Sequence, residues 1–323
     1  MSVKKIRTWL LNKSLVADII SRYIVQKKIL PYYTKIKGES TINGIVYIAD
    51  GLIIHGGLSD RLRGMVSLYA YCFEYGIPYH IYHISPFNLS DYLVPNEYNW
   101  KLDNNKISFD SKKTKVCVIR PIGDNTEKYF CNRLSSHYRN SQLLVYTNVT
   151  YKKHSFSEYF NRLFTPSLPV QNLVNEVISN IGENYVSLTF RFQQLLGDFN
   201  EAKYKVMDEQ SRKNLINKCL LAIERVYNEN DVDRVLVTSD SKLFLEIAQK
   251  RFKYVAIIPG EVKHIDYTND KNNLAYIKSF VDLFVISKAR KVYFYSTGEM
   301  YEKSGFAETG AMIGGREYVS ICE

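Results

Sequence analysis

Short apolar runs alternate with stretches of helical spacing along most of the chain, and the first set begins near residue 45. Apolar runs of about four to eight residues between turn residues are typical of strands, whereas apolar residues three to four positions apart are typical of helices. The pattern predicts strands at 46–49, 52–55, 78–84, 115–120 and 143–146, and a helix at 61–74. Strands that alternate with helices favour a parallel sheet with crossover helices.

A second set of the same kind follows the segment 165–182. It predicts strands at 185–190, 235–238, 254–258 and 291–295, and helices at 211–227, 242–251, 274–289 and after Thr297. Between the sets, the prolines of 165–169 are typical of a linker. At 323 residues the chain is also longer than one hydrophobic core usually supports. We therefore expect two α/β domains.

Residues 1 to about 38 alternate basic and apolar residues at helical spacing. Such a segment is either a helix packed on the body of the protein or a basic amphipathic helix that contacts anionic lipid. We favour the packed helix, because most amphipathic stripes face a core. Charged and polar residues interrupt its apolar runs, so we expect neither a signal peptide nor a membrane anchor. The expected organisation is a helical segment at 1–40 and domains at 41–170 and 171–323.

The composition indicates which class of partner the protein binds and which cellular compartment it occupies. A formal charge of +10 suggests an anionic partner, which could be a nucleotide, a nucleic acid or an anionic membrane. Lys and Arg are scattered along the chain, and the absence of a long basic tail argues against nucleic acid. The 26 tyrosines either stack on sugars or bases or simply pack in cores. Five cysteines without a Cys-x-x-Cys pair indicate neither a disulfide framework nor a zinc site, and fit the reducing cytoplasm.

A glycine turn precedes the first predicted helix, in the stretch Gly56-Gly57-Leu58-Ser59-Asp60-Arg61. Glycines at such a turn permit positive φ angles and close approach of a ligand, and the new helix presents free N–H groups to an anion. Arg61 and Arg63 add positive charge nearby. The alternative is a tight turn in which Ser59 or Asp60 caps the helix.

An arginine ends a strand of the second set. Arg191 follows the run 186–190, and Gly197-Asp198 comes shortly after it. Ligands collect at the carboxyl ends of strands in open α/β sheets, and a guanidinium can bind two oxygens of a departing diphosphate at once. The alternative is an arginine paired with a surface carboxylate.

Two further strand ends carry small polar side chains. Asp240 and Ser241 follow the run 235–238, where they could hold a base or ribose or cap the next helix. Ser296-Thr297-Gly298 and Ser304-Gly305-Phe306 follow the run 291–295. They form either a second phosphate cradle or ordinary helix caps.

In this order, the four stretches resemble the GT-B fucosyltransferase-like superfamily, which includes the nodulation fucosyltransferase, the protein O-fucosyltransferases and enzymes of the α-1,2-fucosyltransferase type. The resemblance runs from about residue 45 to 315 and is carried by these short motifs. It implies an α/β, GT-B-like fold of two Rossmann-like domains with a cleft between them. The first domain would lie on the acceptor side and the second would bind the nucleotide-sugar donor.

The resemblance also implies roles for single residues. Arg191 would hold the β-phosphate of GDP-fucose, as the arginine of the family's His-x-Arg-x-Gly-Asp-like motif does, with Thr189 at the histidine position. Asp240 and Ser241 would lie at the base or ribose. The other donor-side residues that it implies are Gly56, Gly57, Arg61, Ser296, Thr297, Ser304, Gly305 and Phe306.

The expected reaction is an inverting sugar transfer that needs no cofactor. Arg191 and backbone amides would neutralise the leaving group without a metal ion. The pair Asp231 and Asp233 lies before a strand, away from the predicted strand ends, and does not suggest a metal site. An inverting transfer needs a base for the acceptor hydroxyl, and Asp60 is the candidate because it lies on the glycine turn; alternatively it only caps the helix.

The sequence leaves two other hypotheses about the function open. Thr189 and the four residues 193–196, which separate Phe192 from Gly197, depart from the family motif and could select another nucleotide-sugar. A protein without enzymatic activity that binds nucleic acid or anionic membrane would also explain the charge. For a transferase of this kind, the acceptor would be a glycan or lipid-linked glycan of a bacterial envelope. The enzyme would then bind its acceptor at the inner face of the bacterial membrane.

Overall fold

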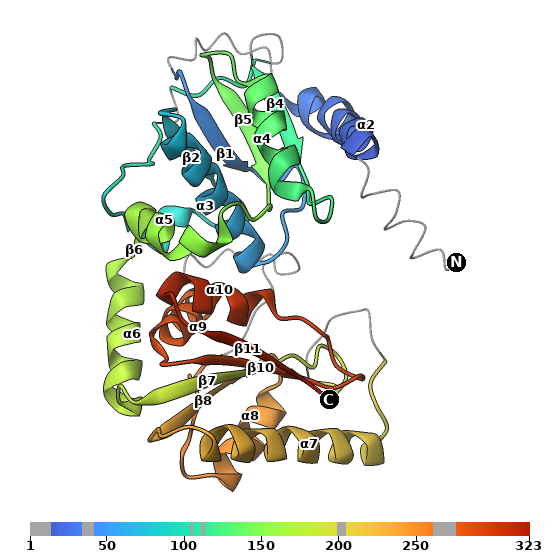
Figure 1. Cartoon of the computed structure of the whole chain (residues 1–323), viewed down its shortest axis with the longest axis vertical. Coiled ribbons are helices and arrows are strands. Elements are labelled where there is room, and N and C mark those ends of the chain that lie inside the picture. The colour runs from blue at the N-terminus through green and yellow to red at the C-terminus, as the bar shows by residue number, and fades with distance from the viewer. Residues whose placement is uncertain (1–13, 34–41, 104–105, 111–113, 199–204, 261–275) are drawn as a thin grey trace. The chain divides into compact units, whose positions relative to one another are not determined.

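The computed structural model describes residues 14–33, 42–103, 106–110, 114–198, 205–260 and 276–323 (Figure 1). These residues form two compact units, and the chain passes from one to the other between Thr165 and Pro166. Both units combine parallel sheets with helices, which confirms the predicted α/β class. None of the helices in the described parts of the chain is long and apolar enough to cross a bilayer.

The first unit is built on a parallel sheet with the strand order β2-β1-β5-β4. Its strands are β1 (Ile45–Ala49), β2 (Tyr79–His83), β4 (Lys115–Ile119) and β5 (Leu143–Thr147). Its α-helices are α2 (Ser14–Ile24), α3 (Leu58–Glu74), α4 (Thr126–His137) and α5 (Phe156–Leu163). Every residue of the central strands β1 and β5 is buried, as expected for a parallel sheet covered on both faces.

Short elements complete the first unit. A π-helical turn, η1 (Val25–Ile29), and a 3₁₀ turn, η2 (Leu30–Tyr32), continue α2, and two further 3₁₀ turns are η3 (Leu89–Asp91) and η4 (Lys153–Ser155). The strands β3 (Leu93–Pro95) and β6 (Phe164–Pro166) pair with each other.

The second unit contains a five-stranded parallel sheet with the order β11-β10-β7-β8-β9. Its strands are β7 (Tyr185–Phe190), β8 (Arg234–Ser239), β9 (Val255–Ala256), β10 (Val292–Ser296) and β11 (Tyr318–Cys322). Its helices are α6 (Leu168–Ile181), α7 (Glu209–Asn228), α8 (Lys242–Arg251), α9 (Ile277–Lys288) and α10 (Gly305–Gly314). Helices α9 and α10 lie on one face of this sheet, and α7 and α8 on the other (Figure 1).

Close packing fixes the helix that follows the glycine turn. A Cβ atom at Gly64 in α3 would overlap the carbonyl oxygen of Thr147, the last residue of β5. Glycine at this position therefore lets α3 lie directly against the end of the central strand.

Two sequence predictions are wrong. Residues 52–55 do not form a strand: Gly51 has a φ of +89°, the Asp50 carboxylate accepts a hydrogen bond from the Leu52 amide, and Ile54 is 78% exposed. The stretch is apolar but lies in a turn at the end of β1. The expected linker at 165–169 is not irregular either, because β6 and the start of α6 occupy it.

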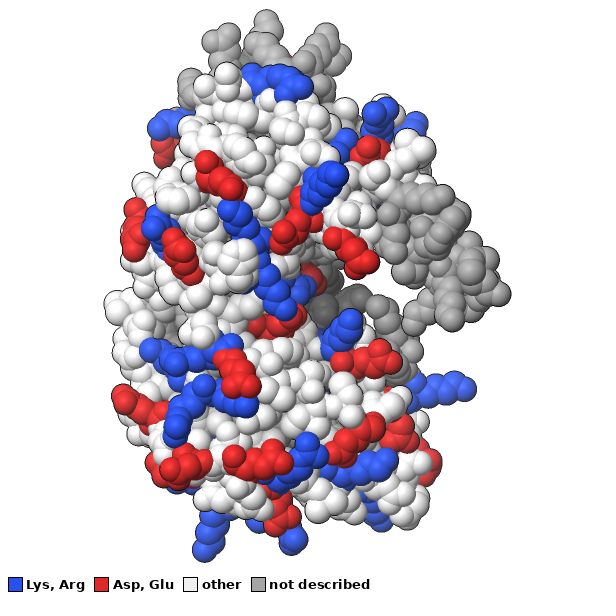
Figure 2. Space-filling model, in the orientation of Figure 1, with Lys and Arg blue, Asp and Glu red and all other residues white. Residues whose placement is uncertain are grey.

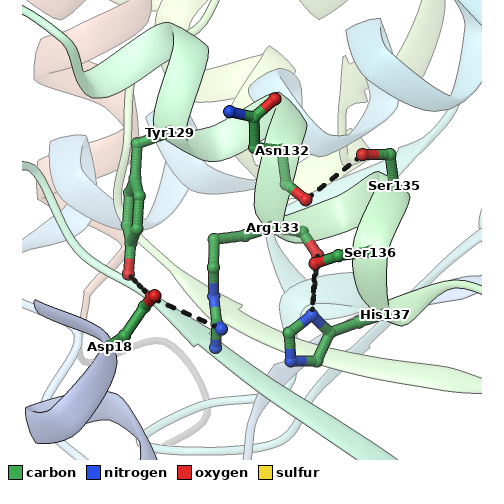
Figure 3. Close-up of polar contacts among 7 residues, drawn as sticks. All are labelled: Asp18, Tyr129, Asn132, Arg133, Ser135, Ser136 and His137. Carbon is green, nitrogen blue, oxygen red and sulfur yellow. Dashed lines mark hydrogen bonds and ion pairs between the residues drawn. The ribbon is translucent and has the colours of Figure 1, made fainter. Parts of the chain in front are cut away.

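The N-terminal helical segment is packed on the first unit within the described range 14–33, as we favoured. Ala17, Ser21 and Ile24 of α2 are buried. Asp18 accepts a hydrogen bond from the Tyr129 hydroxyl at 2.7 Å and lies 3.4 Å from a guanidinium nitrogen of Arg133, both on α4 (Figure 3). The rest of the predicted segment lies outside the described residues.

Candidate functional site

The glycine turn begins α3 without any side-chain cap. Gly56 has a φ of +90°, and Gly57 is the N-cap residue of the helix, with no hydrogen bond from a side chain. The alternative that Ser59 or Asp60 caps the helix is therefore wrong. Asp60 instead pairs with Arg63 one turn further on, and its side chain is 33% exposed. A carboxylate in the first turn of a helix is also stabilised by the helix dipole.

Arg61 is buried and holds the turn to a neighbouring loop. Its Nε donates to the Gly56 carbonyl and its Nη1 to the Ser85 carbonyl, both at 3.1 Å. Ser85 follows β2, so this guanidinium links the loops after two adjacent strands. The predicted residues Gly56, Gly57, Asp60 and Arg61 thus form one local structure.

Two buried histidines, neither of which was predicted as a site residue from the sequence, lie near Arg61. His55 and His83 are each only 4% exposed, and the Nε2 atom of each is buried without a hydrogen-bond partner. The His83 Nδ1–H donates to the Phe87 carbonyl at 3.0 Å, because a carbonyl can only accept. Burial, and then the charge of Arg61, lowers the pKa of each histidine to about 3. Both rings are therefore neutral at physiological pH.

We expect these histidines to make the first unit sensitive to acid. The unfolded chain gains a proton on each near pH 6.5, whereas the folded chain does so only near pH 3. The contribution of the two histidines to stability is therefore constant above pH 6.5 and falls as the pH drops towards 3, by about 1.4 kcal/mol per pH unit for each histidine. Urea unfolding as a function of pH measures this slope.

The variant His83→Asn keeps a group that can donate to Phe87 but cannot titrate, and it should lower the slope by about 1.4 kcal/mol per pH unit, the contribution of one histidine. The matched control is His154→Asn, which replaces an exposed histidine of the same unit. A slope that is equal in the wild type and His83→Asn would contradict this prediction.

In the second unit, three of the predicted stretches meet at one sheet edge. Strand β7 lies between β10 and β8, with Phe190 opposite Tyr295 on one side and Ser239 on the other. The residues that follow, Arg191 and Asp240, lie at the carboxyl edge of the sheet together with Ser296, the last residue of β10. Ligands collect at such an edge in open α/β sheets.

Arg191 is partly buried at this edge. Its guanidinium carbon lies 5.4 Å from the ring centroid of Tyr301, within the range of a cation–π contact. Tyr301 is 43% exposed, and Arg191 is itself partly exposed. A ring in this position attracts the guanidinium and favours one orientation of the side chain.

Asp240 fixes the turn that follows Arg191. One carboxylate oxygen accepts a hydrogen bond from the Phe192 amide at 2.9 Å and the other from the Gln193 amide at 2.8 Å. Burial raises the pKa of Asp240 to about 6, although these amides and Arg191 act in the opposite direction. The carboxylate is thus ionised at neutral pH and lies near the guanidinium.

The turn itself carries conformational strain. Gln193 has a φ of +52°, a conformation that a non-glycine residue rarely adopts. Its side-chain oxygen is buried and has no hydrogen-bond partner. Strained residues cluster at functional sites, where their surroundings hold them in place.

Two other predicted site residues of the second unit, Thr189 and Ser241, lie next to this edge in sequence and make buried or capping hydrogen bonds. The hydroxyls of Thr189 and Thr238 lie 2.8 Å apart and are buried between β7 and β8. Ser241 caps α8 through the Phe244 amide, and its own hydroxyl donates to Asp198 at 2.9 Å. Asp198 also accepts from the Leu243 amide, a link that the sequence did not reveal.

The predicted residues between Ser296 and Phe306 comprise a buried strand end and a helix cap. Ser296 and Thr297 are buried, and the Thr297 hydroxyl accepts a hydrogen bond from the Glu299 amide. Ser304 caps α10 through the Ala307 amide, as the alternative interpretation held, while Gly305 and Phe306 form the first turn of that helix.

On the face drawn in Figure 2, basic and acidic side chains are interspersed and form no single basic patch. No group of three or more His, Cys, Asp or Glu side chains suited to a metal ion lies among the residues that the structure describes.

Comparison with known proteins identifies the fold. No protein-family model and no curated protein sequence matches the chain. A mutant of FUT1 from Arabidopsis thaliana, solved with GDP, is 12% identical with a TM-score of 0.56, over 98% of this chain and 79% of that one. NodZ α-1,6-fucosyltransferase soaked with GDP-fucose is 11% identical with a TM-score of 0.55, over 84% and 93%. A structure of NodZ from Bradyrhizobium is 11% identical with a TM-score of 0.53, over 84% and 92%. The chain therefore has the GT-B fucosyltransferase-like fold that its motifs predicted.

Proposed function

We propose that the chain is a glycosyltransferase that transfers fucose from GDP-fucose to a hydroxyl group of a glycan, with inversion at the sugar carbon. The observation that carries the proposal is the carboxyl edge of the second sheet, where Arg191 follows the central strand on a turn that Asp240 holds. A fixed cation at this place is what a departing diphosphate requires, since negative charge develops on its oxygens. The fold shared with fucosyltransferases supports the same chemistry.

Binding of the nucleotide-sugar tests the choice of donor. A ligand that binds only the folded state stabilises it, by about 2.7 kcal/mol at a concentration of 100 Kd. We expect GDP and GDP-fucose to raise the melting temperature, and UDP-sugars to leave it unchanged. A response to UDP-sugars alone would be consistent with a glycosyltransferase but would exclude GDP-fucose as its donor. No response to any nucleotide, together with salt-sensitive binding to generic polyanions, would favour the binding protein instead.

Asp60 is the proposed general base for the acceptor hydroxyl. The variant Asp60→Asn should lower turnover by about 10²- to 10⁴-fold and leave the donor affinity nearly unchanged, because only proton transfer is lost. Initial rates with GDP-fucose and calorimetric titration with GDP measure the two effects separately. The matched control is Asp103→Asn, since Asp103 forms the same kind of ion pair with Lys106, three residues later, in the same unit. Loss of donor affinity alone would remove Asp60 from this role.

Metal independence is a further prediction of this proposal. Arg191 and backbone N–H groups would supply the charge that a divalent cation supplies elsewhere. Turnover should therefore be the same within about twofold in excess EDTA and in Mn²⁺. Activity that disappears with EDTA and returns with Mn²⁺ would contradict it.

We also propose that the acceptor is a glycan or a lipid-linked glycan of a bacterial envelope, fucosylated on the cytoplasmic side. A net charge of +10 suits work beside anionic phospholipid. Thin-layer chromatography of lipid extracts after incubation with radiolabelled GDP-fucose tests this. Label that appears only in water-soluble glycans would exclude the lipid-linked acceptor.

A further inference from the structure

The outward face of α2 carries an apolar stripe. Leu15, Ile19 and Tyr23 are 70%, 60% and 59% exposed. They are four residues apart, so they follow one another along the same face of the helix. Apolar stripes of this length normally face a core or a partner.

The opposite face of the same helix is already packed. Ala17, Ser21 and Ile24 are buried, and Asp18 reaches Tyr129 and Arg133 on α4 (Figure 3). The contact with the first unit therefore fixes which side of α2 faces outwards. The stripe is not the core-facing side of this helix.

The exposed charges beside the stripe have one sign. Arg22, Lys27 and Lys28 are all exposed. Arg22 is seven residues from Leu15, which places it on the same face. The only acidic residue in the range 14–33 is Asp18, and it points to α4 (Figure 3). The outward surface is thus apolar and positively charged.

We propose that this surface, defined by Leu15, Ile19 and Tyr23 with Arg22, Lys27 and Lys28, docks on the surface of an anionic lipid bilayer. Apolar side chains on such a helix enter the boundary between headgroups and acyl chains, and the basic side chains contact anionic headgroups. Tyr23 suits this boundary, because its ring is apolar and its hydroxyl stays in water. The inference stands independently of the proposed sugar transfer.

A second copy of the chain fits the surface less well. Two copies paired through this surface would bring Arg22, Lys27 and Lys28 of both into one interface, and Asp18, the only acidic residue in 14–33, already pairs with α4. Like charges brought together in this way oppose association. Anionic lipid offers the complementary charge.

Vesicle sedimentation with the full chain tests the proposal. We expect the protein to bind phosphatidylcholine vesicles that contain about one-third phosphatidylglycerol, and to bind pure phosphatidylcholine at least tenfold more weakly. The combined variant Lys27→Gln/Lys28→Gln should weaken the binding about 25-fold, because each basic residue contributes about fivefold to the affinity. Leu15→Ser/Ile19→Ser should weaken it by at least about tenfold.

The controls replace residues of similar exposure in the second unit. Leu221→Ser removes an apolar side chain that is 65% exposed on α7, and Lys250→Gln removes an exposed lysine on α8. Both should bind as the wild type does. Equal binding of wild type and the α2 variants would overturn the proposal. So would a dimer in analytical ultracentrifugation that Leu15→Ser/Ile19→Ser dissociates, since the surface would then be an interface between copies.

Discussion

The variant Arg191→Ala is expected to lower the turnover of sugar transfer by at least about 10²- to 10³-fold and to leave the protein folded. Removal of one group that stabilises developing negative charge costs about 10²- to 10³-fold in turnover, and this guanidinium can contact two diphosphate oxygens at once. Donor affinity should fall as well, because the same charge attracts the diphosphate before the reaction. Steady-state rates and titration with GDP measure both losses.

Arg191→Lys should recover only part of the activity. Lysine keeps the charge, but it lacks the planar fork that binds two oxygens. The matched control is Arg251→Ala in the same unit, because the Arg251 guanidinium also lies beside an aromatic ring, at 5.9 Å from Phe252, but does not follow a central strand. Turnover of Arg191→Ala within about threefold of the wild type would contradict the proposed role, since a phosphate ligand is worth far more.

The variant Asp240→Ala is expected to weaken donor binding although the residue itself need not touch the donor. The Phe192 and Gln193 amides lose their acceptors, and the turn after Arg191 is released from its strained conformation. Hydrogen bonds to a charged group contribute about 1.5–3 kcal/mol each, so both stability and donor affinity should fall. Thermal unfolding and titration with GDP measure the two effects.

A double-mutant cycle separates positioning from simple destabilisation. If Asp240 acts through Arg191, the losses of donor affinity in Asp240→Ala and Arg191→Ala should not add. Donor affinity of the wild type should also fall below pH 6, where the carboxylate gains a proton and can no longer accept both bonds. The control is Asp233→Ala, an exposed aspartate at the other end of β8. Additive losses in the cycle would assign Asp240 a purely structural role.

Most strands could be predicted because buried parallel strands are short apolar runs. Strand β7 has the bounds that the sequence predicted, and helix α8 does too. The prediction of a strand at 52–55 was wrong because an apolar run does not reveal that Ile54 is exposed. Helix α6 was missed because Pro166 and Pro169 were interpreted as breakers, although proline is tolerated in the first turn of a helix.

The candidate site was predictable only in part. The position of Arg191 at a strand end could be predicted, because the apolar run that precedes it is a local sequence pattern. Ligands bind at such strand ends in open α/β sheets. The bonds from Asp240 to the turn after β7, and from Asp198 to the start of α8, join residues more than 40 positions apart. Such contacts depend on the strand order, which one sequence does not specify. The neutral histidines His55 and His83 were missed for the same reason, since burial and Arg61 lower their pKa only in the folded unit.

A crystal structure of the protein with GDP tests the central claim most directly. The account predicts that the diphosphate binds at the carboxyl edge of the second sheet, with its oxygens within hydrogen-bond distance of the Arg191 guanidinium. A diphosphate bound elsewhere, with Arg191 still lying against Tyr301 and making no contact to it, would contradict the account.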